Sequence, residues 1–465
     1  MKSLIFISLF ALASLSSANI INVPAQYSTI QSAINASVNG DTILVQPGTY
    51  TENINFRGKN IVVTGTYYLS GNLSLIQTTI INGGSPVNPD TASCVIISSH
   101  EDSTAVLQGF TLTGGMGTKW TDEHGAGLFR EGGGILIQYS KPVIQYNIIT
   151  GNSAVAGGVI STGGGGVRIG DSYPRFHNNI VTNNTGFYGA GVVLNYTGGE
   201  YYNNLIFKNY GSNVFGSGSG IWLNGSFTRP VTITNNTIVS NTSINGTPGV
   251  YGFGSVVATM RNNIIWGNTS PNNAQITGGN FTVRYCNVQN GYNGAGNINA
   301  NPDFDTTNYY LRSTSPCVDK GDSSVIYNDP ADPGNPSNAK WPARGTLRND
   351  LGAYGGPGSA TIANSIVGIG SQNLMTLPDN FILNQNYPNP FNPTTKISYE
   401  LNKSSEVSLK VFDILGNEVS VLFNGTQTAG SYSVNWNAAD FPSGVYFYKL
   451  ETQTGSEIKS MMLVK

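Results

Sequence analysis

A block of the form Asn-Asn-aliphatic, closed by another Asn, recurs five times in the middle of the chain. The copies YNIITGN, NNIVTNN, NNLIFKN, NNTIVSN and NNIIWGN begin at residues 146, 178, 203, 235 and 262, and their second residues are 32, 25, 32 and 27 positions apart. A repeat of this length, with some variation between copies, is typical of solenoids, in which each coil of chain packs on the preceding one. The repeat therefore predicts a solenoid and names no reaction.

Gly-rich strand openings precede four of the blocks, as GGGILI, GGGVRI, GAGVVL and GSGIWL. Short β-branched runs that alternate with a period of two, between Gly and Asn corners, favour strands over helices. Equivalent residues of stacked coils would lie about 4.8 Å apart. The residues predicted to point inward are Ile135, Val167, Val192 and Ile221 on one sheet, and Ile144, Phe176, Tyr201 and Ile233 on another.

The Asn residues of the blocks form two rows when the coils are aligned. Asn at a corner tolerates left-handed backbone geometry, and stacked side-chain amides can bond to one another and to the main chain. We therefore interpret both rows as scaffold and not as ligand sites. The rows are Asn147, Asn179, Asn204, Asn236 and Asn263, and Asn152, Asn184, Asn209, Asn241 and Asn268.

Residues 20–356 resemble the right-handed parallel β-helix proteins, the superfamily of pectate lyases and related polysaccharide enzymes. The segment YSTIQSAINASVNGDTILVQPGTYTENI at 27–54 is similar to their N-terminal cap and first coil, with a short amphipathic helix around Ile30, Ala33 and Ile34. DFDTTNYYLRSTSPCVDKGD at 303–322, followed by NDLGAYGGP, is similar to the end of such solenoids. The resemblance implies an all-β chain dominated by a right-handed parallel β-helix.

The last 85 or so residues resemble the type A sorting domain of the type IX secretion system. The resemblance is carried by NYPNPFNPTTKISYEL, LKVFDILGNEV, PSGVYFYKL and the terminal KSMMLVK, in that order. It implies contact with the type IX secretion machinery, passage across the outer membrane, and release or surface attachment. Alternating residues such as Val407, Leu409 and Val411 independently indicate a small antiparallel β-sandwich, and a fibronectin-like binding module is the alternative.

The N-terminus has the three regions of a secretory signal peptide, with Lys2, an apolar run, and small residues up to Ala18. No other apolar run is long enough to span a bilayer. We expect the protein to be secreted or attached to the outer-membrane surface, via the periplasm. The predicted parts are a signal peptide at 1–18, a capped β-helix at 19–356, a linker at 357–378 and the sorting domain at 379–465.

Composition narrows the range of partners. Only 10% of the residues are charged, against about 25% in an ordinary domain, and the net charge is -2. Such a chain offers nucleic acid or an acidic membrane no electrostatic attraction. Cys94, Cys286 and Cys317 are interpreted as buried small residues, with a Cys286–Cys317 bridge as the alternative. Both solenoid ends look capped, so the chain is expected to be a monomer.

The longest insertion between coils, residues 114–131, holds the densest charged cluster of the solenoid. Outward positions on the adjoining strands are Leu136, Arg168, Val193 and Trp222. Aromatic rings stack on the C–H faces of sugars, while charged and amide groups bind hydroxyl and uronate groups. An extracellular polysaccharide is therefore the predicted partner. The alternative is a loop that is polar simply because it is exposed to solvent. The predicted substrate-binding residues are Trp120, Asp122, Glu123, Arg130, Tyr139, Asp171, Tyr196 and Trp222.

Two chemistries fit this region. A lyase needs a base beside a uronate and a cation for the enolate, which points to His124 or Glu131 with Arg168; Arg168 suits charge stabilisation, and His124 is the better base. A glycosidase needs paired carboxylates, such as Asp122 or Glu123 with Glu131 or Asp171. The Asp-rich signature of polygalacturonases and the calcium cluster and Arg motif of pectate lyases are absent. A non-catalytic structural or adhesive surface protein is therefore the alternative function.

Two further clusters have simple structural interpretations. Arg175 and Glu200 occupy equivalent positions in neighbouring coils near His177, which predicts an exposed ion pair. The acidic residues of the closing region lie among Gly, Pro and Asn, where Asp makes turns. No cofactor and no metal site is predicted, although calcium, which prefers oxygen ligands, is kept as an alternative. The acidic residues concerned are Asp322, Asp329, Asp332 and Asp350.

Overall fold

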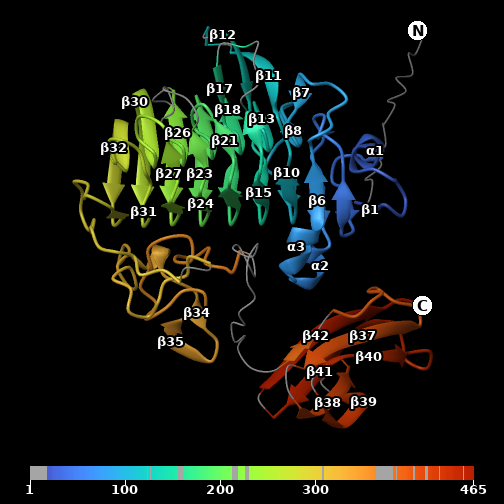
Figure 1. The fold of residues 1–465 in the computed structure, drawn as a ribbon. Helices are drawn as coiled ribbons and strands as arrows, with labels where there is room; N and C mark the ends of the chain where they lie inside the picture. Colours follow the sequence, from blue (N-terminus) through green and yellow to red (C-terminus); the bar gives the residue numbers. More distant parts are fainter. Residues whose placement is uncertain are drawn as a thin grey trace, which may run out of the picture. The chain divides into compact units, whose positions relative to one another are not determined.

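The computed structural model of the chain describes residues 18–122, 124–125, 127–154, 159, 161–211, 218–225, 230–305, 308–362, 381–383, 385–401, 404–413, 417–428, 430–453 and 455–465. The chain divides into two compact units, with the boundary after residue 367. The first unit contains the repeats and the second the C-terminal strands (Figure 1). Residues 1–17, which hold most of the predicted signal peptide, lie outside the described residues, so that prediction stands as made.

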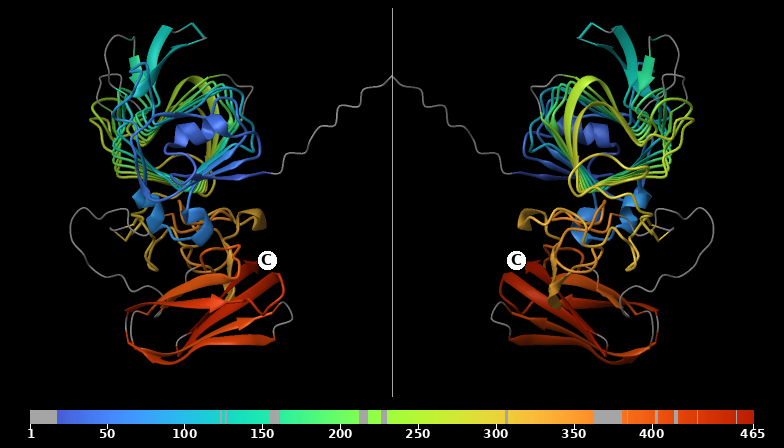
Figure 2. Two further views of the ribbon diagram at one scale, coloured as in Figure 1. Left: turned by 90° about the vertical axis from the view of Figure 1, so that its right-hand side faces the viewer. Right: turned by 90° about the vertical axis from the view of Figure 1, so that its left-hand side faces the viewer.

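The first unit is a parallel β-helix, as predicted. Its coils superimpose into one closed outline when the solenoid is viewed from its end (Figure 2). Each complete coil adds one strand to each of three parallel sheets, as β13 (Ile135–Gln138), β14 (Val143–Gln145) and β15 (Ile148–Thr150) do.

The three sheets are built from the following strands. Sheet 1 contains β4 (Ile54–Asn55), β8 (Val95–Ile97), β13, β18 (Val167–Gly170), β22 (Val192–Asn195) and β26 (Ile221–Asn224). Sheet 2 contains β1 (Ile20–Val23), β2 (Thr42–Val45), β5 (Val62–Gly65), β9 (Val106–Gln108), β14, β19 (Arg175–His177), β23 (Gly199–Tyr202) and β27 (Val231–Thr234). Sheet 3 contains β3 (Gly48–Tyr50), β6 (Thr79–Asn82), β10 (Thr111–Thr113), β15, β20 (Ile180–Thr182), β24 (Leu205–Phe207), β28 (Thr237–Val239), β31 (Ile264–Trp266) and β33 (Asn287–Val288).

Two long strands join sheets 1 and 2 at the C-terminal end of the solenoid. β30 (Val250–Arg261) pairs with β26 through its first residues and with β27 through its last residues. β32 (Ile276–Arg284) follows β30, with a register shift between Gly252 and Val257. The two sheets are therefore continuous at this end.

The inward rows predicted from the repeat are confirmed. Ile135, Val167, Val192 and Ile221 are paired in register along sheet 1. The corresponding row of sheet 2 is also in register, and both rows lie in one hydrophobic core. Stacked aliphatic and aromatic side chains therefore form one core that runs through the coils.

Both Asn rows form continuous hydrogen-bonded ladders. The backbone N–H and the side-chain Nδ2 of Asn204 both donate to Oδ1 of Asn236, at 3.0 Å each. The same Nδ2 also donates to the Phe176 carbonyl of the previous coil at 2.8 Å. The left-handed geometry belongs to another residue: Asn203, just before the ladder residue, has φ 53°, as its counterparts do in the other blocks. In each Asn-Asn pair, the first residue adopts the left-handed backbone conformation and the second forms the ladder hydrogen bonds. We had predicted both roles for a single residue.

The ladders end on residues other than Asn. The backbone N–H of Asn263 donates to Sγ of Cys286, which occupies the ladder position of the next coil, at 3.3 Å. Asn268 donates through Nδ2 to Oε1 of Gln275 at 2.8 Å. All three cysteines are buried and free, so the interpretation as small buried residues is confirmed and the alternative Cys286–Cys317 bridge is absent.

The two ends of the solenoid are covered differently. Helix α1 (Ile30–Ala36) packs its apolar residues into the first coils, as predicted, and the Glu52 carboxylate accepts the N–H groups of its first two residues at 2.9 Å each. After the last coil the chain returns over residues 303–362. The first Asn of several pairs holds this return: Asn203 Nδ2, for example, donates to the carbonyls of Ala353 and Gly355.

Apart from the strands of the 114–131 insertion and their partners, which are described below, the remaining elements of the first unit are short. They are α2 (Tyr67–Ser70), α3 (Ser74–Thr78), η1 (Val325–Tyr327), the hairpin of β34 (Ala331–Asp332) with β35 (Asn335–Ala339), and a parallel sheet of β16 (Ser153–Ala154), β21 (Thr185–Gly186), β25 (Tyr210–Gly211) and β29 (Thr242–Ser243).

The second unit consists of two antiparallel sheets around their own apolar core, which confirms the predicted sandwich. The alternating residues Val407, Leu409 and Val411 are buried in this core. Among the described residues, no helix is long and apolar enough to cross a membrane. One sheet contains β36 (Phe381–Leu383), β37 (Thr394–Leu401) and β40 (Gly430–Asn437), and the other contains β39 (Glu418–Gln427), β38 (Ser405–Phe412), β41 (Gly444–Thr452) and β42 (Gly455–Leu463).

Candidate functional site

The insertion at 114–131 folds as a β-hairpin and not as the loop expected from its polar sequence. Its strands are β11 (Gly117–Asp122) and β12 (Gly127–Glu131), which pair antiparallel. β11 also pairs with β7 (Thr91–Ala92), and β12 with β17 (Ser161–Gly163). The hairpin rises beside sheet 1 in Figure 1. Because residues of a strand alternate between its faces, one hairpin face is directed at the outward residues of sheet 1.

Arg168 lies in the middle of this covered region and is completely buried. Its Cζ is 3.7 Å from the centroid of the Trp120 ring, a cation–π distance. Its Nε donates to Oε2 of Glu131 at 3.0 Å, and Trp120 Nε1 donates to the same oxygen at 2.8 Å. Glu131 is only 2% exposed, so both members of this ion pair are shielded from water. The three side chains fix one another at the base of the hairpin.

Two neighbouring features complete this buried cluster. Tyr188 donates its hydroxyl to Oε1 of Glu131, and burial together with the Glu131 charge holds the pKa of Tyr188 well above its usual range. Gly170 leaves room for the guanidinium, because a Cβ there would come within 2.1 Å of Arg168 Nη1. A side chain at position 170 would therefore displace the Arg168 guanidinium, and loss of the Tyr188 hydroxyl would remove a hydrogen bond from the Glu131 carboxylate. Both charged groups are buried, so water cannot compensate either change.

A second cluster lies near the tip of the hairpin. His124 stacks on Tyr196 with a centroid separation of 3.5 Å and an interplanar angle of 15°. Its Nε2 lies 3.2 Å from both carboxylate oxygens of Asp171. The His124 side chain is 33% exposed and that of Asp171 is 13% exposed, so this pair is open to solvent. The contacts attach the hairpin tip to the turns that follow β18 and β22.

Gln138 connects the two clusters. Its Oε1 accepts from Nη1 of Arg168, and its Nε2 donates to Oδ2 of Asp171 at 3.2 Å. The candidates Trp120, Glu131 and Arg168 on one side and His124, Asp171 and Tyr196 on the other thus belong to one hydrogen-bonded and stacked network.

Two adjoining hollows open on this network, and we name them together the hairpin groove. They share Tyr139, which lines both. The first hollow, of about 300 Å³, is lined by Asn55, Thr91, Ile96, Ser98, Thr118, Trp120, Leu136, Gln138, Tyr139 and Arg168. The second hollow, of about 370 Å³, is lined by Tyr139, Ser140, Lys141, Asp171, Ser172 and Tyr173.

The other predicted site residues lie outside the groove lining. Arg130 points to the opposite face of the hairpin, where its guanidinium donates to the carbonyls of Pro89 and Gly117. Asp122 accepts the N–H of His124 at 2.7 Å and stabilises the hairpin turn. Trp222 packs on Tyr188 and Phe253 one coil further along. Glu123 lies outside the described residues.

Several groove residues were missed in the sequence because they are neutral. Gln138 is the most important, and its register offered a signal: it lies directly opposite Gly170 in the next coil. A glycine beside a long polar side chain leaves space for that side chain to meet Arg168, two residues from Gly170. Asn55, Thr91 and Ser98 lie in earlier coils that carry no Asn-Asn block, so no alignment placed them near the hairpin.

The structure differs from the ion pair that we predicted for Arg175 and Glu200. Arg175 and Glu200 are in register, as predicted, but the described residues show no ion pair between them. Instead, His177 of the same strand stacks on Tyr202 at a centroid separation of 4.5 Å.

The acidic residues of the closing region accept hydrogen bonds from the protein itself. Asp322 pairs with Arg261, and Asp350 accepts the N–H groups of Asp319 and Arg344 at 2.8 and 2.7 Å. The described residues contain no group of three or more His, Cys, Asp or Glu side chains that could hold a metal ion.

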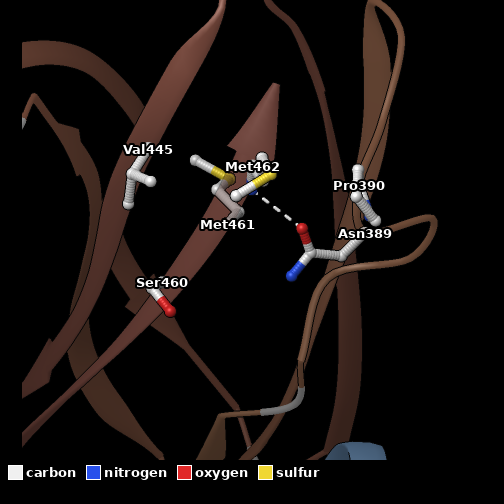
Figure 3. A pocket seen from close by; sticks show the side chains of 6 residues that line it. All are labelled: Asn389, Pro390, Val445, Ser460, Met461 and Met462. Carbon is white, nitrogen blue, oxygen red and sulfur yellow. Dashed lines mark hydrogen bonds between the residues drawn. The ribbon is translucent and has the colours of Figure 1, made fainter. Parts of the chain in front are cut away.

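The second unit has a hollow of its own, of about 260 Å³ (Figure 3). It lies between the Asn389–Pro390 turn and the strands β41 and β42, and Asn389 Oδ1 accepts the N–H of Met462 at 2.8 Å. This bond attaches the Pro-rich turn to the last strand of the chain.

Comparison with known families identifies the second unit. Residues 385–465 match the family described as the secretion system C-terminal sorting domain. The protein is exported by type IX secretion. Its destination is the cell surface or the extracellular space, and its sorting domain implies interaction with the secretion machinery.

The other comparisons are less informative. The chain is similar to the enzymatically active domain of tailspike protein 4 of bacteriophage CBA120, with 11% sequence identity and a TM-score of 0.23. The alignment covers 91% of this chain and 64% of that one, so the chain spans less than two thirds of the tailspike domain. No curated protein matches the chain.

Proposed function

We propose that this exported β-helix protein binds an extracellular polysaccharide in the hairpin groove. The observation that carries the proposal is the position of Trp120. This partly exposed side chain lines the groove, and its ring is fixed by Arg168 at 3.7 Å and by a 2.8 Å hydrogen bond to Glu131. A platform held at two points loses little conformational entropy when a sugar ring stacks on it.

The remaining lining supports the same function. Hydroxyl and amide side chains surround Trp120, and Tyr139 and Tyr173 extend the aromatic surface into the second hollow. Sugars bind through this combination, because their C–H faces pack on rings while their hydroxyl groups exchange hydrogen bonds with neutral polar groups. The groove lies on the rigid solenoid, where the Asn ladders hold each coil in register.

The geometry favours binding over cleavage. Of the three residues predicted for lyase chemistry, only His124 is exposed, with Asp171 at 3.2 Å. Arg168 and Glu131 are buried and paired, so neither contacts a substrate in this arrangement. The non-catalytic alternative for a surface protein therefore takes the form of a glycan-binding solenoid, which distinguishes it from a passive spacer.

A glycan array with the purified mature chain tests the proposal. We expect binding to at least one class of extracellular polysaccharide and a loss of about ten-fold or more in affinity for Trp120→Ala, since one aromatic platform contributes on the order of 1–3 kcal/mol. Tyr68→Ala removes an aromatic residue that is 60% exposed elsewhere and serves as the matched control. The absence of binding, or equal affinity of Trp120→Ala, would reject the proposal, and product analysis on the same samples detects cleavage.

A further inference from the structure

We infer that the hairpin groove prefers a neutral sugar segment to one that carries a carboxylate. This inference rests on the proposed polysaccharide binding and adds the chemical class of the ligand. It starts from the charges around the groove, because a uronate must find a cation there to replace the water it loses.

The one cation in the lining of the first hollow is already neutralised. Arg168 has no exposed surface, and its Nε is 3.0 Å from the carboxylate of Glu131. Its second partner is the neutral Trp120 ring, which covers one face of the guanidinium. Arg168 therefore acts as a positioning residue for Trp120, and its positive charge is not available to compensate a ligand carboxylate.

The nearest carboxylates make an additional negative charge unfavourable. Glu131 bonds the Arg168 guanidinium directly, and Gln138 bonds both Arg168 and Asp171. Both carboxylates therefore belong to the hydrogen-bonded network of the guanidinium. A uronate in the first hollow would add a third carboxylate to a network that contains one Arg and one exposed His124. Like charges brought together in a partly desolvated site repel one another, which disfavours the acidic ligand.

The second hollow does not change this balance. Its lining contains one cation, Lys141, and one carboxylate, Asp171. His124, which is outside this lining, has its Nε2 3.2 Å from the Asp171 carboxylate. The positive and negative charges in the lining of the second hollow are therefore equal in number.

The uncharged lining provides the bonds that a neutral sugar needs. Asn55, Thr91, Ser98 and Thr118 surround the first hollow, and each can both donate and accept. The hydroxyl groups of a neutral sugar can pair with these side chains and add no charge to the network.

Matched oligosaccharides that differ only in charge test the inference. Oligogalacturonate and its fully methyl-esterified form have the same backbone, and the mature full-length chain would be titrated with each by calorimetry at low and moderate salt. We expect the ester, together with neutral oligosaccharides from the array, to bind about ten-fold or more tightly than the acid, with little dependence on salt. Tighter binding of the acid, weakened by salt, would overturn the inference and leave the proposed function intact.

A variant sharpens the same experiment. Glu131→Gln keeps the shape of the side chain and removes the charge that neutralises Arg168, so the preference should shift toward the acid by about ten-fold. If this variant fails to fold, the ratio measured for the wild-type chain still decides. Binding of no oligosaccharide of either kind, with an empty glycan array, would reject the proposed function itself.

Discussion

Asn235 and Asn349 exchange side-chain hydrogen bonds across 114 residues of sequence: Nδ2 of each donates to Oδ1 of the other, at 3.0 and 3.2 Å. Asn235 is the left-handed first residue of its Asn-Asn pair, and its Nδ2 also donates to the carbonyl of Asp350 at 2.9 Å. The returning chain is thus attached to the solenoid by the repeat itself. Both amides are buried, so removal of one leaves polar atoms of the other without this partner and away from solvent.

We expect Asn235→Ala to lower the free energy of unfolding by about 1–3 kcal/mol, because it leaves buried partners on the returning chain unsatisfied. Urea unfolding of the mature chain measures the change, and hydrogen exchange should locate it in residues 317–356. Asn335→Ala, at an exposed position, is the control. Equal stability of the two variants would show that this amide pair does not hold the closing region.

The Asn ladder predicts coupling between coils. Asn204→Ala removes donors to Phe176 and Asn236 and should cost about 2–4 kcal/mol, since several buried groups lose partners worth about 1–3 kcal/mol each. Once Asn204 is absent, Asn236→Ala should cost less, with a coupling energy of about 0.5–3 kcal/mol in a double-mutant cycle. Strictly additive losses in urea unfolding would mean that the two side chains act independently.

Gly170 should be intolerant of a side chain. In Gly170→Ala the new Cβ would lie 2.1–2.4 Å from the guanidinium of Arg168, which Trp120 confines on its other side. We expect a loss of about 1–3 kcal/mol of stability from overpacking and a weaker binding of glycan by the displaced Trp120. Gly334→Ala meets only one atom within 4 Å, at 3.5 Å, and is the matched control. Wild-type stability of Gly170→Ala would contradict the enclosed position of Arg168.

The closing region should lose stability as the pH rises. Burial and the nearby Asp350 carboxylate raise the pKa of Asp329 to about 8, and burial raises that of Asp350 to about 7. Because these pKa values exceed the ordinary value of 3.8, the folded chain holds protons that the unfolded chain releases. The stabilisation is therefore complete below about pH 4 and lost between about pH 4 and 8.

Unfolding in urea at pH 5, 6, 7 and 8 measures this effect. The midpoint should fall across the series in the wild-type chain and fall less in Asp329→Asn, which cannot ionise. The backbone N–H groups that Asp329 and Asp350 accept favour the charged carboxylates and oppose burial. A midpoint that rises with pH would show that these hydrogen bonds dominate.

Truncation separates export from folding. A chain that ends at residue 367 lacks the second unit, which contains the segment that matches the sorting-domain family. The solenoid keeps its own core. We expect this chain to fold with an unchanged β-sheet circular dichroism signal per residue of solenoid and to accumulate in the periplasm of the producing cell. Appearance of the truncated chain in the medium at wild-type levels would contradict the sorting role.

The sequence was most informative where the repeat supplied an alignment. The outward row Leu136, Arg168, Val193 and Trp222 was predicted from the Gly-rich openings and is found in register. The same alignment could not show that the hairpin encloses Arg168, because burial of an outward residue depends on chain from another part of the sequence. Neutral groove residues such as Gln138 were missed for the same reason: their role comes from their neighbours and not from their chemistry.

Within each ladder, every Asn donates to the Asn of the next coil and accepts from the Asn of the previous coil. The side-chain amides therefore all point the same way along the solenoid axis, and the stack has a donating end and an accepting end. Its donating end is used up by Cys286 and Gln275, and its accepting end by the N–H groups of Phe110 and Gly115. Both ladders therefore begin and end on groups of the same chain, so each stack of amides is closed at its two ends by residues outside the repeat.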